Sequence, residues 1–196
     1  MVKEVLIAQK NYSVSILFFK TGDWTEDNDL KLLNKLNTNN IVLDATKNQL
    51  SLWFLYSLLH KAAYLISKIT SSSLLINGFA ENKRSVQLLF FFLRHRFKYH
   101  LLISRGIATL YPCYMFSKIN KIPYSFDLED YHHGESNIPQ KINLRRNLIS
   151  NILPKIYGLS YSSPLFVDQL NLEKIKYNKD NSLFIPNSFF SNDFNF

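Results

Sequence analysis

The chain has 196 residues, of which 46% are apolar, so it is long enough and apolar enough to form a folded core and is not a disordered segment. Its 23 Lys and Arg outnumber 15 Asp and Glu, and the formal charge of +8 suits nucleic acid, an anionic membrane surface or a phosphorylated ligand. No zinc-finger, RNP or glycine-rich phosphate motif accompanies the basic residues, so we expect no nucleic-acid partner.

Cysteine content and hydropathy exclude further classes of protein. The single cysteine, Cys113, excludes a disulfide framework and a cysteine-based zinc cluster, and its apolar neighbours predict a buried thiol. Residues 1–10 lack an apolar run long enough for a signal peptide. The longest apolar windows are 50–69, which charge interrupts, and 86–93, which is too short, so neither is expected to span a bilayer. We expect a cytoplasmic protein, with the inner face of the membrane as an alternative location.

The first third of the chain predicts short elements followed by one long helix. β-branched and aromatic residues predict a strand over residues 12–20, which Thr21-Gly22-Asp23 ends. A short helix over residues 29–36 and a short strand over residues 41–43 follow. Apolar residues at helical spacing then predict a helix over residues 49–69.

We expect that long helix to turn one face toward the core and to keep Lys61 and Lys68 away from it. The residues assigned to the core face are Leu52, Leu55, Leu58, Leu59, Ala62, Ala63 and Ile66. Ser71, Ser72 and Ser73 interrupt the pattern, and residues 74–77 are expected to be a small strand or a loop.

A second amphipathic helix is predicted over residues 83–97. Its apolar residues, expected to point inward, are Leu88, Leu89, Phe92 and Leu93. Its basic residues, expected to point outward, are Arg84, Arg94 and Arg96. Such a helix either packs on a core with a solvated charged face or rests on anionic lipid.

From residue 99 onward, strands and helices alternate. Strands are predicted over residues 99–104, 123–128, 157–162 and 182–185, and helices over residues 109–121, 140–153 and 164–171. This alternation is typical of βαβ units and predicts an α/β fold, namely a Rossmann-like doubly wound, mostly parallel sheet with helices on both faces. The loops expected at the carboxyl edge of the sheet are residues 105–108, 127–135, 162–163 and 187–188.

Residues 122–135 contain the strongest candidate site. An apolar and aromatic run ends in four carboxylates and two imidazoles within nine residues. Ligands of open α/β sheets bind just outside the carboxyl ends of strands, where such groups serve as general bases, cation ligands or acceptors for sugar hydroxyls. A solvated acidic turn is the alternative. The absence of any cation from residues 127–135 of a basic chain favours a site.

Residues 126–135, FDLEDYHHGE, resemble the Phe-Asp-x-Glu-Asp-Phe-His-x-Gly-Glu segment of bacterial glycosyltransferases with the GT-B architecture, close to the family 4 type. The neighbouring segments agree in order. LLISRGIATL at residues 101–110 precedes the motif, GLSYSSPLFVDQL at residues 158–170 resembles that family's ASPLIAEAL, and LFIPNSF at residues 183–189 resembles its closing strand. The resemblance covers residues 99–190.

The resemblance implies an acceptor-binding part of such an enzyme, in which the loop after this strand faces a cleft between two domains. By that analogy, His132 or Asp130 would be catalytic and would deprotonate an acceptor hydroxyl. His133, by alternation, would lie outside the site. The substrate-binding residues implied are Glu129, Glu135 and Asp127 for sugar hydroxyls and Arg105 for an acceptor phosphate.

Other chemistries are not expected. The family's reaction resembles a metal-independent type, and no second His or Cys pair has metal-ligand spacing, so we expect no metal and no cofactor. No nucleophile elbow, P-loop or Gly-x-Gly-x-x-Gly motif is present in the sequence.

We expect residues 1–196 to form a single Rossmann-like domain that lacks the family's first strand-helix unit and its C-terminal domain, which binds the nucleotide-sugar. The expected function is acceptor binding in polysaccharide biosynthesis, inactive alone, in a split subunit or the product of a decayed gene. The expected partners are a glycan or lipid-linked sugar acceptor, a separate donor-binding subunit and a peripheral membrane contact. The alternative is a non-catalytic α/β module that binds a glycan or a protein.

Overall fold

The computed structural model describes residues 2–22, 28, 31, 33–34, 36, 38–70, 73–95, 98–130 and 136–186. The chain separates into two compact units, Met1–Tyr56 and Ser57–Phe196. The helix expected over residues 29–36 lies largely outside the described residues, and the predicted edge loop at 187–188 lies wholly outside them.

The first unit contains a two-stranded parallel sheet. Its elements are α1 (Val2–Ala8), β1 (Ser15–Lys20) and β2 (Asn39–Asp44), followed by the first residues of α3. The sequence predicted both strands, although β1 begins three residues later than expected, and it did not predict α1. A small buried cluster forms the core of this unit and consists of Val5, Ile16, Leu33 and Leu36.

The long helix α3 (Leu50–Ser67) confirms the predicted helix, but the predicted core face is wrong at four positions. Leu55, Leu58, Ala62 and Ile66 are exposed. Ala63 is buried as predicted, together with Tyr56 and Ser67, which were not assigned to the core face. Because α3 is apolar around most of its circumference, its pattern does not select one side. Lys61 and Lys68 are exposed, as predicted.

Polar contacts with α4 (Leu74–Glu81) and α7 (Pro139–Ile152) mark the packed side of α3 in the second unit. His60 Nδ1 lies 2.9 Å from the Phe79 carbonyl oxygen of α4. Gln140 of α7 donates from Nε2 to the Tyr64 carbonyl oxygen and to Ser67 Oγ, at 3.1 and 3.2 Å. These tertiary contacts, which no local pattern encodes, determine which side of α3 is covered.

The expectation of a strand or loop over residues 74–77 is wrong, because these residues begin the helix α4. The Ser73 side chain caps this helix by accepting from the backbone N–H of Ile76. Asn82 follows directly and caps the next helix, α5 (Lys83–Arg94), by accepting from the Arg84 N–H at 3.0 Å. The predicted strand or loop is therefore a short helix, and the helix predicted over residues 83–97 is present as α5, which begins at Lys83 as predicted and ends at Arg94.

Helix α5 buries Leu88, Leu89 and Phe92, as predicted. Leu93 is exposed, which corrects its predicted inward position, because it lies in the last turn of the helix. Arg94 is exposed as expected, whereas Arg96 lies outside the described residues.

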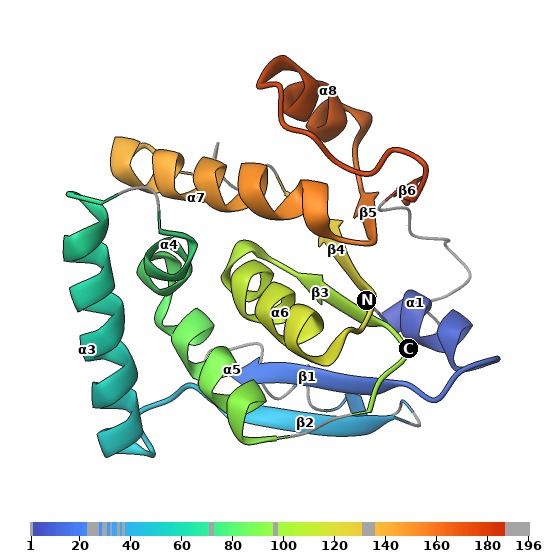
Figure 1. Ribbon diagram of the computed structural model, residues 1–196. Coiled ribbons are helices and arrows are strands. Elements are labelled where there is room, and N and C mark those ends of the chain that lie inside the picture. Colours follow the sequence, from blue (N-terminus) through green and yellow to red (C-terminus); the bar gives the residue numbers. More distant parts are fainter. Residues whose placement is uncertain are drawn as a thin grey trace. The chain divides into compact units, whose positions relative to one another are not determined.

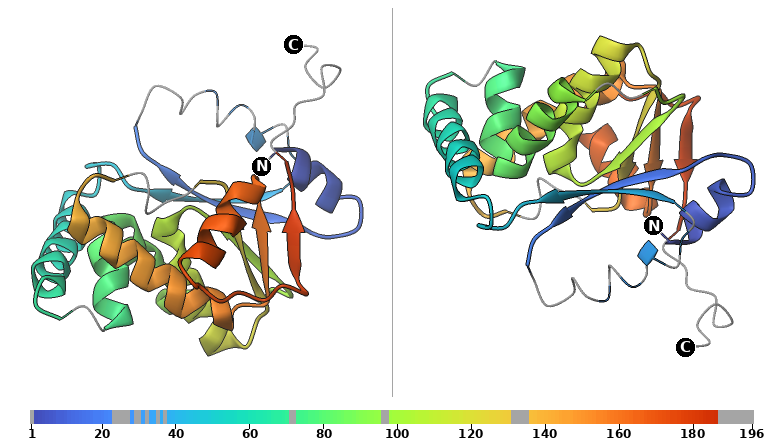
Figure 2. Two further views of the ribbon diagram at one scale, coloured as in Figure 1. Left: turned by 90° about the horizontal axis from the view of Figure 1, so that it is seen from above. Right: turned by 90° about the horizontal axis from the view of Figure 1, so that it is seen from below.

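The second unit contains a four-stranded parallel sheet in the order β3-β4-β5-β6. Its elements are β3 (Leu102–Arg105), α6 (Ile107–Asn120), β4 (Tyr124–Leu128), α7, a 3₁₀ turn (Leu153–Lys155), β5 (Gly158–Tyr161), α8 (Pro164–Leu172) and β6 (Ser182–Phe184). Figure 2 shows these strands side by side, and Figure 1 shows α4, α5, α6 and α7 packed together.

Each predicted strand and helix from residue 99 onward is present, with its ends shifted by a few residues. β4 is the most buried strand, since Tyr124, Phe126 and Leu128 are almost completely covered. These three residues alternate with Ser125 and Asp127, as the period of a strand requires. The protein is therefore an α/β protein with parallel sheets flanked by helices, consistent with the predicted Rossmann-like doubly wound fold.

Gly78 of α4 lies against Tyr111 of α6. A Cβ atom at this position would collide with the ring of Tyr111 and would lie 2.8 Å from its Cβ. Alanine normally stabilises a helix interior by about 1 kcal/mol relative to glycine. For Gly78→Ala we expect the opposite sign, a loss of about 1–3 kcal/mol from overpacking, measured by urea unfolding.

The exposed α4 residue Leu75 provides the control for this prediction. Leu75→Ala is expected to change the free energy of unfolding by about 0.5 kcal/mol or less, because its side chain is half exposed. A stabilised Gly78→Ala variant would show that the two helices do not meet at this position.

Candidate functional site

Three neighbouring strands end with polar side chains on the same rung of the sheet. In the parallel register, Arg105 of β3 lies opposite Asp127 of β4, and Asp127 lies opposite Ser160 of β5. Residues on one rung of adjacent strands point to the same face of the sheet. The carboxyl ends of β3, β4 and β5 therefore present a cation, an anion and a hydroxyl side by side.

These side chains form one connected group, which we call the strand-end cluster: Arg105, Asp127, Glu129, Ser160 and Ser162. Arg105 Nη2 lies 2.9 Å from Asp127 Oδ2, and its Nη1 lies 2.8 Å from Glu129 Oε1. Ser160 donates from Oγ to the other Asp127 carboxylate oxygen at 2.6 Å. Ser162 donates to the backbone carbonyl of Glu129 at 2.9 Å.

Burial within the strand-end cluster decreases from Asp127 toward Glu129. The side chain of Asp127 is 11% exposed, that of Arg105 25% and that of Glu129 35%. The guanidinium group holds both carboxylates in fixed positions through charge-assisted hydrogen bonds. With one cation and two anions, the cluster carries a formal charge of −1, and Glu129 is its most accessible carboxylate.

The structure brings together three of the residues that the sequence singled out, Arg105, Asp127 and Glu129. Asp130 follows Glu129 and is exposed. His132, His133 and Glu135 lie outside the described residues.

The contacts of Arg105 differ from those expected of a phosphate-binding residue. The resemblance implied that this residue binds an acceptor phosphate, whereas its guanidinium contacts two carboxylates of the same edge. A phosphate group at Arg105 would therefore compete with Asp127 and Glu129 for the same hydrogen-bond donors.

Ser160 and Ser162 were not predicted to belong to the site. Ser160 lies inside a strand, where a serine has no distinguishing local pattern, and only the register of β4 with β5 places it beside Asp127. Ser162 lies in a loop that was predicted at the carboxyl edge of the sheet. This position near the end of β4 was the indication in the sequence that Ser162 could belong to the site. Both hydroxyls fix the acidic segment from the neighbouring strand.

A group of polar side chains connects β3, β4 and α6 in the interior of the second unit. Tyr124 Oη and Ser104 Oγ are 2.8 Å apart, and Thr109 Oγ1 lies 2.9 Å from Ser104 Oγ. Burial raises the pKa of Tyr124 well above its usual value and raises the pKa of Cys113 to about 12. Cys113 is therefore a protonated, buried thiol at neutral pH, as predicted, and is unsuited to act as a nucleophile.

A polar groove of about 630 Å³ runs along α7 in the same unit. Amides and hydroxyls form most of its lining, with two basic side chains beside them. The lining residues are Ser67, Lys68, Asn77, Gln140, Asn143, Leu144, Arg146, Asn147 and Ser150. Amide side chains both donate and accept hydrogen bonds, which suits a neutral ligand rich in hydroxyl groups.

The described part of the chain contains neither a cluster of metal ligands nor a membrane-spanning helix. Among these residues, no group of three or more His, Cys, Asp or Glu side chains is arranged to hold a metal ion. None of the described helices combines the length and hydropathy needed to cross a bilayer. No protein-family model matches the chain, and no curated protein matches its sequence.

Proposed function

We propose that this chain is the acceptor-binding part of a glycosyltransferase of the GT-B type, which takes a sugar from a nucleotide-sugar and transfers it to a glycan or lipid-linked acceptor. The observation that carries the proposal is the strand-end cluster, in which Asp127 and Glu129 are held by Arg105 at the carboxyl edge of a parallel sheet. That edge is where open α/β sheets bind ligands. The resemblance of residues 126–135 to the glycosyltransferase motif supports the same assignment.

In this proposal, the strand-end cluster orients the acceptor sugar. Glu129, the more exposed carboxylate, accepts hydrogen bonds from sugar hydroxyls, and the buried Asp127 fixes Arg105. Arg105 then acts as a positioning residue that holds Glu129 in place, instead of binding a phosphate. Fixed carboxylates lower the entropy cost of orienting the acceptor.

The chemical step assigned to the following loop is general-base catalysis. A proton leaves the acceptor hydroxyl for Asp130 or His132, the hydroxyl oxygen bonds to the anomeric carbon of the donor, and the bond from that carbon to the nucleotide diphosphate breaks. General-base catalysis contributes about a hundredfold to ten-thousandfold in rate. It requires a donor sugar held nearby, which in GT-B enzymes is the task of the second domain.

A glycan array tests the proposal, followed by titration of the chain with the glycan that binds most strongly. We expect Glu129→Gln to weaken binding about tenfold or more, because a charged acceptor is lost while the shape of the side chain is kept. Asp168→Asn provides the control, since this carboxylate is exposed on α8 and should leave binding unchanged.

Two results would contradict the proposal. The first is glycan binding that Glu129→Gln leaves unaltered. The second is tight binding of a uridine or guanosine diphosphate-sugar by this chain alone, since the proposal assigns the donor to another domain. Transfer itself is tested by joining the chain to a donor-binding GT-B domain, where Asp130→Ala or His132→Ala should abolish the reaction.

A non-catalytic glycan-binding module is the second candidate, and the polar groove along α7 favours it. Asn143 is exposed within this groove, so Asn143→Ala removes an amide without disturbing the core. If the chain is a binding module that uses this groove, Asn143→Ala weakens glycan binding and Glu129→Gln does not. The reverse pattern supports the acceptor site at the strand ends.

A further inference from the structure

The polar groove along α7 is built from three segments of the second unit. Ser67 ends α3 and Lys68 follows it, Asn77 belongs to α4, and the other lining residues belong to α7. Figure 1 shows the end of α3 and helix α4 beside the first half of α7. The groove volume of about 630 Å³ lies within the range of about 300–1,000 Å³ that is typical of small-molecule sites.

A hydrogen-bond network fixes the orientation of Gln140 in this groove. Ser67 donates from Oγ to the Tyr64 carbonyl oxygen at 2.8 Å, so Ser67 Oγ accepts from Gln140 Nε2 at 3.2 Å. Gln140 Nε2 also donates to the Tyr64 carbonyl oxygen, at 3.1 Å. These two contacts use both hydrogens of the amide, so its carbonyl oxygen Oε1 is left to accept a hydrogen bond from a ligand hydroxyl.

Other amides line the groove at different depths. Asn77 is only 2% exposed, whereas Asn143 is exposed and can rotate to present either its oxygen or its NH₂ group. A sugar hydroxyl both donates and accepts a hydrogen bond, so amide side chains can meet it with either group. The amides therefore favour a sugar, but they do not select its charge.

The charged residues of the groove lining are all positive. Lys68 and Arg146 line the groove, and its lining residues include no Asp or Glu. Arg146 is paired with Glu173, so Lys68 supplies the excess positive charge. Lys68 Nζ lies 5.7 Å from the centre of the Tyr64 ring, and this cation–π contact favours an ammonium position next to the residue that also binds Gln140.

We propose that the groove along α7 binds an acidic sugar, which is a sugar that carries a carboxylate or a phosphate group. The hydroxyls of this ligand bind Gln140 and Asn143, and its negative group forms a charge-assisted hydrogen bond with Lys68. A neutral sugar binds the same amides without that contact. The proposal rests on the second candidate function, which assigns a glycan to this groove, and it adds the class of sugar.

The strand-end cluster has the opposite charge preference. Its formal charge is −1, and its most accessible charged group is the carboxylate of Glu129. Like charges repel, so an acidic sugar is disfavoured at the strand ends. Acidic sugars therefore probe the groove separately from the acceptor site proposed above.

The test is titration of the full chain with glucuronate, glucose-6-phosphate, glucose and inorganic phosphate, followed through the side-chain amide signals of Gln140 in nuclear magnetic resonance spectra. We expect the acidic sugars to bind about threefold to fivefold more tightly than glucose, as suits a contact with one exposed lysine. Inorganic phosphate should bind at least about fivefold more weakly than glucose-6-phosphate, because it makes no hydroxyl contacts with the amides. The tighter of the two acidic sugars identifies the preferred acidic group.

Three substitutions separate the charge of the groove from its amides. Lys68→Gln should abolish the preference for acidic sugars and leave glucose binding unchanged. Asn143→Asp keeps the shape of the side chain but adds a carboxylate, so it should weaken acidic sugars more than glucose. Asn143→Ala should weaken glucose and both acidic sugars by about fivefold, because a hydrogen-bonding amide is lost.

Matched controls change similar residues outside the groove. Lys118→Gln removes an exposed lysine of α6, and Asn171→Ala removes an exposed amide of α8, so neither should alter any of these affinities. Circular dichroism and thermal unfolding establish that the Lys68 and Asn143 variants remain folded, as the exposure of both side chains predicts.

Three outcomes would overturn the proposal. Inorganic phosphate that binds as tightly as glucose-6-phosphate would show a simple anion site. Glucose that binds as tightly as both acidic sugars and is weakened by Asn143→Ala would remove the acidic class but keep the glycan-binding role of the groove. Absence of binding by all three sugars would remove both. Glu129→Gln should leave glucuronate binding unchanged, so failure of the acceptor site at the strand ends is distinguishable from failure of this proposal.

Discussion

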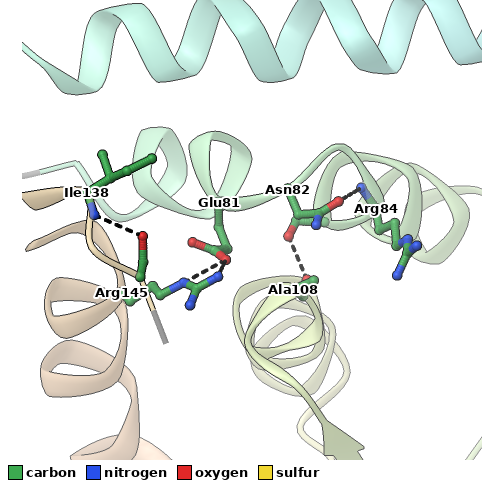
Figure 3. A network of polar contacts seen from close by, with 8 residues as sticks. Glu81, Asn82, Arg84, Ala108, Ile138 and Arg145 are labelled. Atoms are coloured by element: carbon green, nitrogen blue, oxygen red, sulfur yellow. Dashed lines mark hydrogen bonds and ion pairs between the residues drawn. The ribbon is translucent and has the colours of Figure 1, made fainter. Parts of the chain in front are cut away.

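Replacing Arg145 by alanine is expected to lower the free energy of unfolding by about 3–5 kcal/mol. Arg145 of α7 reaches Glu81 at the end of α4, and its Nε and Nη2 atoms each lie 3.0 Å from Glu81 Oε1 (Figure 3). The Glu81 side chain is only 3% exposed and that of Arg145 14%. Removal of the guanidinium takes this ion pair away from a carboxylate in the protein interior, and urea unfolding measures the loss.

The neighbouring residue Arg146 provides a matched control. Arg146 also pairs with a carboxylate, Glu173, at 2.9 Å, but its side chain is 47% exposed. Solvent screening reduces such pairs to about 1 kcal/mol or less, so Arg146→Ala should have a small effect. Equal losses in the two variants would contradict the assignment of the Glu81–Arg145 pair as buried. Replacing Glu81 and Arg145 together by Leu and Met should recover much of the stability.

Stability is also expected to fall steeply above pH 9. Burial raises the pKa of Cys113 from 9.0 to about 12, so the unfolded chain releases this proton at a lower pH than the folded protein does. Between these two values, each pH unit costs about 1.4 kcal/mol, which amounts to about 4 kcal/mol from this thiol alone. The contribution of Cys113 is fully present below pH 9 and is lost as the pH rises through about 12. Burial raises the pKa of Tyr124 as well, which steepens the loss above pH 10.

Urea unfolding from about pH 8 to about pH 11 tests this dependence. Cys113→Ala removes the thiol and should make the decline with pH shallower, although the variant is less stable at neutral pH. Leu110→Ala is the control, because this buried residue of the same helix α6 does not ionise. It should lower stability by a similar amount at every pH, and an unchanged slope in Cys113→Ala would contradict the prediction.

The sheet of the second unit could be predicted from sequence because each of its strands is short, apolar and flanked by helical patterns. In the run from Tyr124 to Leu128, the apolar Tyr124, Phe126 and Leu128 alternate with Ser125 and Asp127, which is the period of a β-strand. The alternation of strands and helices also predicted that Arg105 and Asp127 would share one edge. Their ion pair could not be predicted, since it depends on the register between two strands that are separated by a helix.

Helix α4 shows what a local pattern leaves undetermined. Leu74, Leu75 and Ile76 form a short apolar run that suits a strand as well as a helix. The helix is favoured by Ser73, whose hydroxyl caps it, and by Gly78, which lets Tyr111 of α6 come close. Ser73 was the one signal available in the sequence, and the contact with Tyr111 is tertiary.

The rung shared by Arg105, Asp127 and Ser160 also has a consequence for folding fidelity. If β4 paired with β3 one residue out of register, Asp127 would point to the opposite face of the sheet. An apolar residue of β4 would then lie beside Arg105. Misaligned strands would thus lose their ion pair and leave a cation against hydrocarbon. The side chains that we assign to ligand binding therefore also favour the correct register of the strands. A mutation at one of them is expected to affect both strand pairing and ligand binding.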